Sequence, residues 1–254
     1  MAILQRGGVR LFYEVQGAAN GRTPVLLTHG YSASSRMWQP NVPALAVKRR
    51  LITWDIRGHG KSDSPEDPAL YSEELSVGDM LALLDAEDVD RAVVAGLSLG
   101  GYLSLALHLR HPERVAALML FDTGPGFRRD DAREEWNRRV ERTAAGFDVQ
   151  GPNALRDRPE VSGSQHPSSA GLARAARGIM AQHGPHVIDS LPKIAVPTLV
   201  VVGAGDEPFL AASEYMAAKI PGAREVVIPG AGHASNVDQP EAFNRAVLDF
   251  LETT

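Results

Sequence analysis

The stretch Gly96-Leu97-Ser98-Leu99-Gly100 decides the fold prediction for this 254-residue chain. The apolar run Ala92-Val93-Val94-Ala95 precedes it, and a helical pattern over Leu99–His111 follows it. A Gly-x-Ser-x-Gly sequence between a strand and a helix places its serine on a sharp turn, with the hydroxyl exposed at the top of the sheet. Because the chain has 24 glycines, the five residues alone are a weak signal and need support from the surrounding pattern.

Apolar runs along the chain predict the other strands of this sheet. Most of them are nearly continuous in apolar residues, which is typical of parallel strands buried on both faces. The predicted strands cover Val9–Val15, Pro24–Thr28, Arg50–Trp54, Ala92–Ala95, Val115–Phe121, Val196–Val202 and Arg224–Ile228. The helical patterns between them cover Ser72–Glu87, Leu99–His111, Phe209–Lys219 and Glu241–Leu251. This alternation predicts the α/β class, with a doubly wound and mostly parallel sheet.

The alternation of strands and helices breaks between residues 124 and 188. Charged helical stretches lie near Asp130–Ala145 and Ala170–His183, and a connection rich in Pro, Gly and Ser joins them. Segments of this length without strands are usually functional or disordered. The sequence therefore predicts a core of residues 1–123 and 189–254. Residues 124–188 are predicted to form a small helical cap or lid, with a long surface excursion as the alternative.

The composition excludes several classes of protein and of site. Hydrophobic residues make up 44% and charged residues 22%, and the net charge of −5 indicates no nucleic-acid partner. The absence of cysteine excludes disulfides, a thiol nucleophile and thiolate metal ligands. No stretch has the length and apolarity of a signal peptide or a membrane span, so we expect a cytoplasmic protein without a membrane partner. No dinucleotide, phosphate-loop or zinc motif is present, so we expect no cofactor and no metal, while the oligomeric state stays open.

Polar residues after three predicted strands carry the expected chemistry. Ser98 follows the fourth predicted strand, and Asp206 and His233 follow the last two. The carboxyl ends of parallel strands lie at one edge of a sheet, which is where ligands bind. A serine needs a base to remove its proton, an imidazole does this near neutral pH, and a carboxylate orients the imidazole. We therefore expect these three residues to be catalytic, and Asp122 and Glu207 are the rivals of Asp206 for the acid.

The predicted reaction also needs donors for a developing oxyanion. The backbone N–H of Leu99 lies directly after the nucleophile, at the N-terminus of a helix. The loop His29-Gly30-Tyr31 follows an earlier strand of the sheet. The backbone N–H of Tyr31 is therefore the second predicted donor.

With these residues in place, the sequence resembles the α/β-hydrolase fold family over nearly its full length. The resemblance rests on His29-Gly30 with Trp38 downstream, the stretch 55–62 (Asp-Ile-Arg-Gly-His-Gly-Lys-Ser), the turn at Ser98, Gly203-Ala204-Gly205-Asp206 and Gly232-His233. In that family the segment that matches 124–188 shapes the substrate pocket, and the stretch 55–62 is a structural turn. A serine at position 98 differs from the branches that use an aspartate nucleophile. The chain is similar to small carboxylesterases, 3-oxoadipate enol-lactonases, cofactor-free haloperoxidases and carbon–carbon bond hydrolases.

The resemblance and the order of the three catalytic residues predict a serine hydrolase. We expect it to cleave a small-to-medium carboxylic ester or lactone, its small-molecule partner, through an acyl-enzyme intermediate. The alternatives are a carbon–carbon bond hydrolase of a vinylogous diketone and a slow-turnover ligand receptor or sensor with an intact triad. Large apolar residues near the catalytic positions predict a mostly apolar pocket. Its predicted lining is His29, Gly30, Trp38, Tyr102, Phe127, Trp136 and Phe209.

Overall fold

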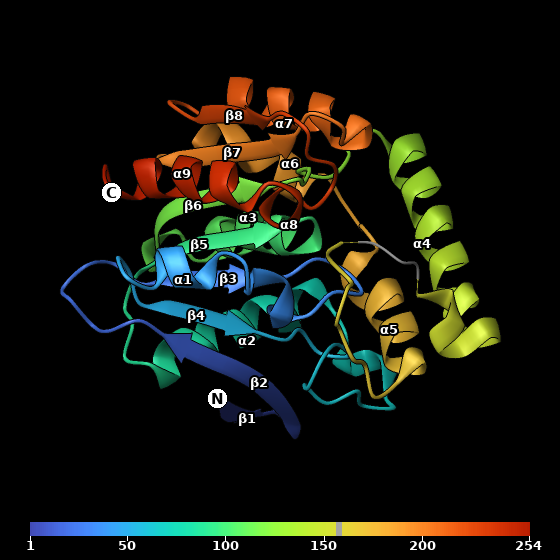
Figure 1. Ribbon diagram of the computed structural model, residues 1–254. Coiled ribbons are helices and arrows are strands. Elements are labelled where there is room, and N and C mark those ends of the chain that lie inside the picture. The colour runs from blue at the N-terminus through green and yellow to red at the C-terminus, as the bar shows by residue number, and fades with distance from the viewer. Residues whose placement is uncertain (156–158) are drawn as a thin grey trace.

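The structure of the protein, a computed structural model, describes residues 1–155 and 159–254. Within these residues eight strands form one sheet in the order β1-β2-β4-β3-β5-β6-β7-β8 (Figure 1). The strands are β1 (Ala2–Arg6), β2 (Val9–Gln16), β3 (Val25–Thr28), β4 (Leu51–Trp54), β5 (Ala92–Leu97), β6 (Val115–Phe121), β7 (Thr198–Gly203) and β8 (Arg224–Ile228). β2 pairs antiparallel with β1 and with β4, and all other neighbours pair in parallel. The predicted α/β class, with its doubly wound and mostly parallel sheet, is confirmed.

Helices cover both faces of the sheet and bury two apolar layers. Alternate strand residues face opposite layers, so Val93 packs in one layer and Val94 in the other. Leu45 and Phe243 complete the first layer from helices α1 and α9, and Met80 helps to complete the second from α2. The helices outside residues 124–193 are α1 (Val42–Leu45), α2 (Glu73–Ala86), α3 (Leu99–Arg110), α7 (Glu207–Lys219), α8 (Ser235–Asp238) and α9 (Pro240–Leu251), with short 3-10 turns at Ser35–Trp38, Pro68–Leu70 and Pro112–Arg114.

One strand, β1, was not expected from the sequence. Its residues are alternately half-buried and exposed, because it forms the edge of the sheet and pairs only with β2. Such a strand carries too little apolar signal in five residues to be separated from a loop. The predicted strand Val115–Phe121 has the same bounds in the structure, and the other predicted strands agree within about two residues.

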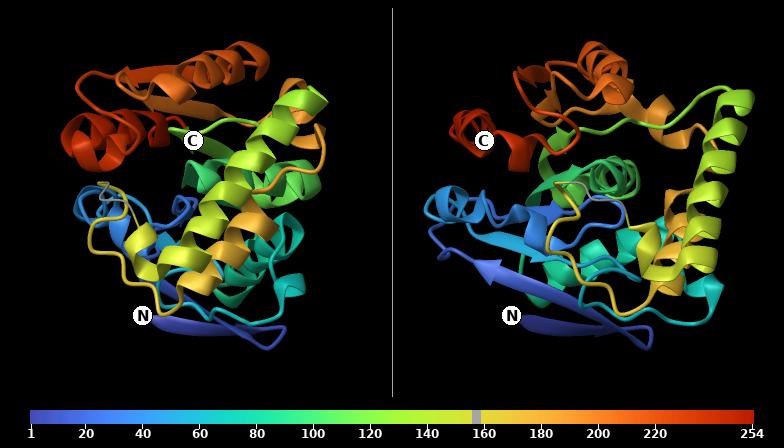
Figure 2. Two further views of the ribbon diagram at one scale, coloured as in Figure 1. Left: turned by 90° about the vertical axis from the view of Figure 1, so that its right-hand side faces the viewer. Right: turned by 45° about the vertical axis from the view of Figure 1, so that its right-hand side comes forward.

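Between β6 and β7 the chain leaves the sheet and forms a group of helices. These are α4 (Asp130–Gln150), η4 (Gly151–Ala154), α5 (Ser169–Ala175), a π turn η5 (Ala176–Met180), α6 (His186–Ser190) and η6 (Leu191–Lys193). Figures 1 and 2 show that α4 and α5 stand beyond the carboxyl ends of the parallel strands. Residues 156–158 of the predicted cap lie outside the described residues. Among the described helices, none combines the length and the apolarity that a membrane span requires.

The helices beyond the strand ends have an apolar core of their own. Val140, Ala144 and Phe147 of α4 pack against Leu172 and Ala176. These residues recur at spacings of three and four in α4, which puts them on one helix face. The opposite face of α4 carries the charged residues, so the pair of helices buries its apolar side toward the sheet edge.

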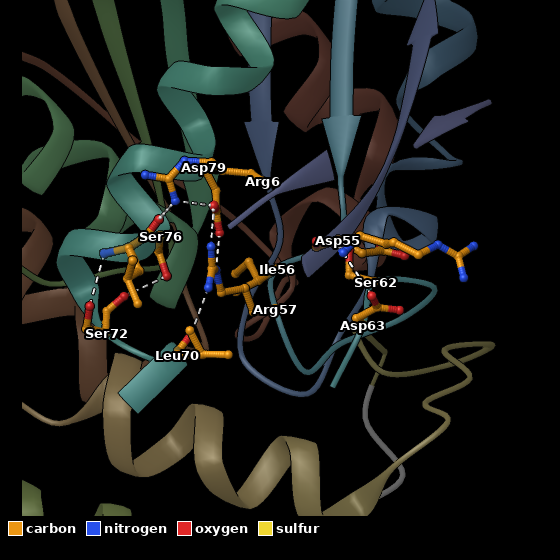
Figure 3. A network of polar contacts seen from close by, with 12 residues as sticks. Arg6, Asp55, Ile56, Arg57, Ser62, Asp63, Leu70, Ser72, Ser76 and Asp79 are labelled. Carbon is orange, nitrogen blue, oxygen red and sulfur yellow. Dashed lines mark hydrogen bonds and ion pairs between the residues drawn. The ribbon is translucent and has the colours of Figure 1, made fainter. Parts of the chain in front are cut away.

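The stretch 55–62 forms a largely buried turn after β4 that is hydrogen-bonded to neighbouring segments of the chain. The carboxylate of Asp55 accepts hydrogen bonds from the backbone N–H groups of Ser35 at 2.7 Å and Lys61 at 2.7 Å. Arg57 is buried and donates to Asp79 of α2 at 2.8 Å, and Arg6 of β1 reaches the same carboxylate at 2.8 Å (Figure 3). The turn therefore ties β1, α2 and the loop after β4 together.

Candidate active site

Ser98 lies on a strained turn between β5 and α3. Its backbone has φ 54° and ψ −115°, a conformation that costs an L-residue about 1–3 kcal/mol. Thr123 helps to hold it there, since its hydroxyl donates to the Ser98 carbonyl oxygen at 2.6 Å. Neither glycine of the stretch can carry a side chain, because the neighbouring backbone is too close. A Cβ at Gly96 would lie 2.2 Å from the carbonyl carbon of Gly100, and one at Gly100 would lie 2.2 Å from the Thr28 carbonyl oxygen. The Ser98 side chain lines a cavity at the end of the sheet.

His233 and Asp206 lie together at the ends of β8 and β7. The Nδ1–H of His233 donates to the buried Asp206 carboxylate at 2.8 Å. Burial lowers the pKa of His233, but the hydrogen bond and the charge of Asp206 outweigh it and raise the pKa above its usual value of 6.5. The ring of Phe209 stacks on the imidazole with the ring centroids 4.9 Å apart. Ser98 and His233 line the same cavity.

Asp122, the main rival of Asp206, has other partners. Its carboxylate accepts the backbone N–H of Gly203 at 2.8 Å and the hydroxyl of Ser235 at 2.5 Å. Burial raises its pKa to about 7, although these hydrogen bonds act in the opposite direction. Asp122 thus joins the end of β6 to the segments that carry Asp206 and His233. Glu207 begins α7 and is exposed.

Of the two predicted oxyanion donors, Tyr31 lies in the loop after β3 and Leu99 directly follows Ser98. Within the part of the chain that the structure describes, neither the Tyr31 N–H nor the Leu99 N–H donates a hydrogen bond. Leu99 is the first residue of the 12-residue helix α3. Gly30 brings the Tyr31 loop close, because a Cβ on it would lie 3.4 Å from the Ser98 Cβ. The Tyr31 hydroxyl donates to the Leu172 carbonyl of α5 at 2.9 Å.

Two cavities open at Ser98, and most of the predicted lining residues contact them. The larger has a volume of about 800 Å³ and includes Gly30, Phe127, Trp136 and Phe209. The smaller has a volume of about 120 Å³ and includes Tyr102, together with Phe127, Trp136 and Phe209. Phe127 lies in the loop between β6 and α4, and Trp136 lies in α4.

Two predicted lining residues lie elsewhere. Trp38 is fully buried in the apolar layer under α9, where it contacts Phe121 and Phe243, because the 3-10 turn that carries it faces the sheet. His29 is fully buried beneath the cavity, where its Nε2 accepts the Ile56 N–H at 2.9 Å. Its Nδ1 lies 2.7 Å from the Gly30 carbonyl oxygen. Both side chains support the loop that carries Tyr31 rather than contacting the cavity.

Sequence reasoning missed two polar cavity residues of the segment between β6 and β7. Glu160 lines the larger cavity as a buried carboxylate whose charge favours protonated His233. Gln182 lines the smaller cavity. Neither of them belongs to a motif, and their positions depend on how the helices pack over the sheet, so no local pattern distinguishes them from surface residues.

Comparisons with known proteins agree with this architecture. A family model described as the alpha/beta hydrolase family matches residues 25–246. The chain is 30% identical to 3-oxoadipate enol-lactonase 2 of Acinetobacter baylyi over 94% of this chain and 92% of that protein. Its structure is similar to a hydrolase from Pseudomonas aeruginosa (TM-score 0.80, 32% identity, 98% of this chain and 97% of that one). It is also similar to an enol-lactonase from Burkholderia xenovorans (TM-score 0.79, 29% identity, 99% of this chain and 100% of that one). The chain therefore belongs to the α/β-hydrolase family.

Proposed function

We propose that the protein is a serine hydrolase that cleaves a small-to-medium carboxylic ester or lactone through an acyl-enzyme. The observation that carries this proposal is the 2.8 Å hydrogen bond from His233 to the buried Asp206, beside a cavity that His233 and Ser98 both line. The family and the similarity to enol-lactonases support it. The residues line a space large enough for a small organic substrate.

The proposed reaction begins when the Ser98 hydroxyl attacks the substrate carbonyl. His233 takes the serine proton on Nε2, while Asp206 accepts from Nδ1–H and stabilises the imidazolium. The N–H groups of Tyr31 and Leu99 bind the oxyanion of the tetrahedral intermediate. Collapse of the intermediate breaks the ester bond, and His233 gives its proton to the leaving oxygen. A water then attacks the acyl-serine and gives its proton to His233. The bond between the acyl carbon and the Ser98 oxygen breaks, and His233 returns the proton to that oxygen as the acid is released.

The decisive experiment is turnover of 4-nitrophenyl esters by the Ser98→Ala variant. We expect kcat to fall about 10³-fold or more, because removal of a triad nucleophile leaves only binding and oxyanion stabilisation. The matched control is Ser162→Ala, which truncates a serine in an exposed turn and leaves kcat unchanged. Unchanged activity in Ser98→Ala rejects the proposal. Turnover of a vinylogous diketone with none of any ester would instead support the carbon–carbon hydrolase alternative.

A further inference from the structure

The loop that carries the Tyr31 oxyanion donor is a tight turn with one residue in a strained conformation. The backbone N–H of Ala33 donates to the Gly30 carbonyl oxygen at 3.2 Å and closes a turn with Tyr31 and Ser32 at its centre. Ser32 has φ 58°, in the left-handed region that favours glycine at this place in a turn. A serine stays in such a conformation only when neighbouring groups hold it there.

The closure of this turn determines where the Tyr31 N–H points. The Gly30 carbonyl and the Tyr31 N–H belong to one planar peptide group and point in opposite directions. The hydrogen bond from Ala33 to Gly30 therefore also fixes the direction of the Tyr31 N–H. Gly30, Tyr31 and Ser32 all line the larger cavity, as Ser98 does. If Ser32 left its positive φ, the turn would open and the donor would change direction.

His166, from the segment between β6 and β7, holds the carbonyl group of Ser32. Its Nε2 lies 3.0 Å from the Ser32 carbonyl oxygen, and its Nδ1 accepts the backbone N–H of Gly60 at 3.0 Å. A carbonyl oxygen can only accept a hydrogen bond and a backbone N–H can only donate one. The His166 that makes both contacts is therefore neutral, with its proton on Nε2. It joins the loop after β3 to the turn after β4.

The surroundings of His166 favour this neutral form. Burial lowers its pKa below the usual value of 6.5, although the hydrogen bond to Ser32 and the charge of Asp55 act in the opposite direction. The ring of His59 packs edge-on against it, with the ring centroids 5.9 Å apart. His59 is fully buried, and its pKa is lowered as well. Both hydrogen bonds of His166 are therefore formed at neutral pH.

Two other contacts join the same segments without holding a backbone group of the turn. The hydroxyl groups of Ser164 and Ser34 lie 3.0 Å apart. The Tyr31 hydroxyl donates to the Leu172 carbonyl oxygen at 2.9 Å, at the far end of the Tyr31 side chain. These contacts dock the segment onto the loop, whereas the contact of His166 acts on the backbone of the turn itself.

We propose that His166 is a positioning residue for the oxyanion site. Its Nε2–H holds Ser32 at positive φ and so keeps the Tyr31 N–H directed at the substrate oxyanion. This inference rests on the proposed serine hydrolase function and adds that the segment 124–188 helps to form the oxyanion site as well as the cavity. The oxyanion exists only in the tetrahedral state, so loss of this contact lowers kcat and leaves KM largely unchanged.

The expected size of the effect follows from what remains in place. His29 holds the Gly30 carbonyl oxygen from the other side, with its Nδ1 at 2.7 Å. Loss of the His166 contact therefore loosens the turn without releasing it. Removal of an oxyanion donor lowers kcat by about 10²–10³-fold, so a misdirected donor lowers it by about tenfold.

The test compares two variants that each keep one of the two ring contacts. The amide of asparagine lies about where Nδ1 does, and the amide of glutamine about where Nε2 does. His166→Asn therefore keeps an acceptor for the Gly60 N–H, whereas His166→Gln keeps a donor for the Ser32 carbonyl. With 4-nitrophenyl butyrate we expect His166→Asn to lower kcat about tenfold, with KM within about twofold of the wild type. His166→Gln retains about a third of kcat or more.

Inhibition by butylboronic acid gives a second readout, because its tetrahedral adduct with a serine places an oxygen in the oxyanion site. We expect its Ki to rise in His166→Asn by about the factor by which kcat falls. The matched control is Ser164→Ala, which removes a contact between the same two segments but none to the turn backbone. Its kcat and Ki stay within about twofold of the wild type.

The outcomes separate this inference from the proposed function. An unchanged kcat in His166→Asn overturns the role of His166. Equal losses of kcat in His166→Asn and His166→Gln, or in His166→Asn and Ser164→Ala, overturn it as well. Where His166→Asn does not fold, His166→Gln decides. Wild-type values of kcat and Ki in that variant support the inference, and a tenfold change in either overturns it.

In all of these cases, Ser98-dependent hydrolysis by the wild type leaves the proposed function standing. A wild type without Ser98-dependent hydrolysis of any ester rejects the proposed function, and this inference with it.

Discussion

His233 lies in surroundings that act on its pKa in opposite directions. Burial lowers that pKa, but the hydrogen bond and charge of Asp206, with further contributions from Asp122 and Glu160, raise it above 6.5. The same interactions stabilise the folded protein fully below pH 6.5, and this stabilisation is lost as pH rises through the folded pKa. In the proposed reaction His233 must be neutral to accept the Ser98 proton, so that reaction and this stabilising interaction favour opposite protonation states.

The pH profile of hydrolysis follows from this shift. We expect kcat/KM to rise with pH through a midpoint above 6.5, because only neutral His233 accepts the proton from Ser98. In Asp206→Asn the same limb moves to lower pH, since the carboxylate charge that holds the proton is gone. Initial rates at low substrate concentration between pH 5 and 9 measure both midpoints. An unchanged midpoint in the variant would show that Asp206 does not set this titration.

The two candidate acids make a second test at this scale. Asp206→Asn lowers kcat by about 10²–10⁴-fold, because the amide presents the wrong hydrogen-bond group to the imidazole Nδ1. Asp122→Asn lowers kcat far less but reduces the melting temperature, since it faces the Gly203 N–H and the Ser235 hydroxyl with an amide. Kinetics and thermal melting of both variants check the ranking. The reverse ranking of kcat would assign the acid to β6.

At the scale of elements, the turn between β5 and α3 depends on close backbone contacts. Gly100→Ala places a Cβ 2.2 Å from the Thr28 carbonyl oxygen, which forces the backbone of β3 or α3 to move. We expect it to lower the free energy of unfolding by about 3 kcal/mol or more. Gly146→Ala is the matched control, because its Cβ would lie 3.9 Å from the nearest atom, in Ala154. Alanine there stabilises α4 by about 0.5–1 kcal/mol, and urea unfolding measures both changes.

The elements also show which parts of the fold could be predicted. β6 and β7 were predicted because a strand buried on both faces is apolar in almost every residue. β1 was not, because an edge strand that pairs on one side has only half of its residues partly buried. Trp38 belongs to the core rather than to the predicted pocket lining, and a large apolar residue in a loop has the same sequence signature in both positions.

At the scale of the whole molecule, the buried carboxylate of Asp79 joins three separate parts of the chain. Arg57 from the turn after β4 and Arg6 from β1 both pair with it, and its side chain is fully buried in α2 (Figure 3). Asp79→Asn leaves the buried Arg57 cation without a counter-charge and lowers the free energy of unfolding by about 3–5 kcal/mol.

The control for this effect is Glu141→Gln on the outer side of α4. Glu141 pairs with Arg177 at 2.7 Å, but both side chains are largely exposed. Surface pairs contribute little, so the change in the free energy of unfolding stays within about 1 kcal/mol. Chemical denaturation of both variants measures the difference, and similar losses in the two would contradict the account of Asp79.

The sequence predicts the residues of the candidate site that follow strands of the sheet. It does not predict the residues that the helices between β6 and β7 bring to the cavities. Ser98, Asp206 and His233 each follow a strand, so the order of strands brings them to one edge. Glu160 and Gln182 reach the cavities only through the packing of α4 against α5 and the turns that follow. That packing depends on contacts between residues about 45 positions apart, such as Asn137 with Gln182. The spacing of apolar residues along the sequence contains no information about such contacts.

The hydrogen bonds between Asn137 and Gln182 have a consequence for laboratory evolution. They lie entirely within the segment 124–188, whereas the hydrogen bond from His233 to Asp206 lies entirely within the sheet edge. A combinatorial library confined to that segment would vary the cavity lining while keeping the hydrogen bond between His233 and Asp206, provided that Glu160, whose charge raises the pKa of His233, is left unchanged. Such a library would also have to keep the contacts that join the segment to the core, such as the hydrogen bond from the Tyr31 hydroxyl to the Leu172 carbonyl oxygen.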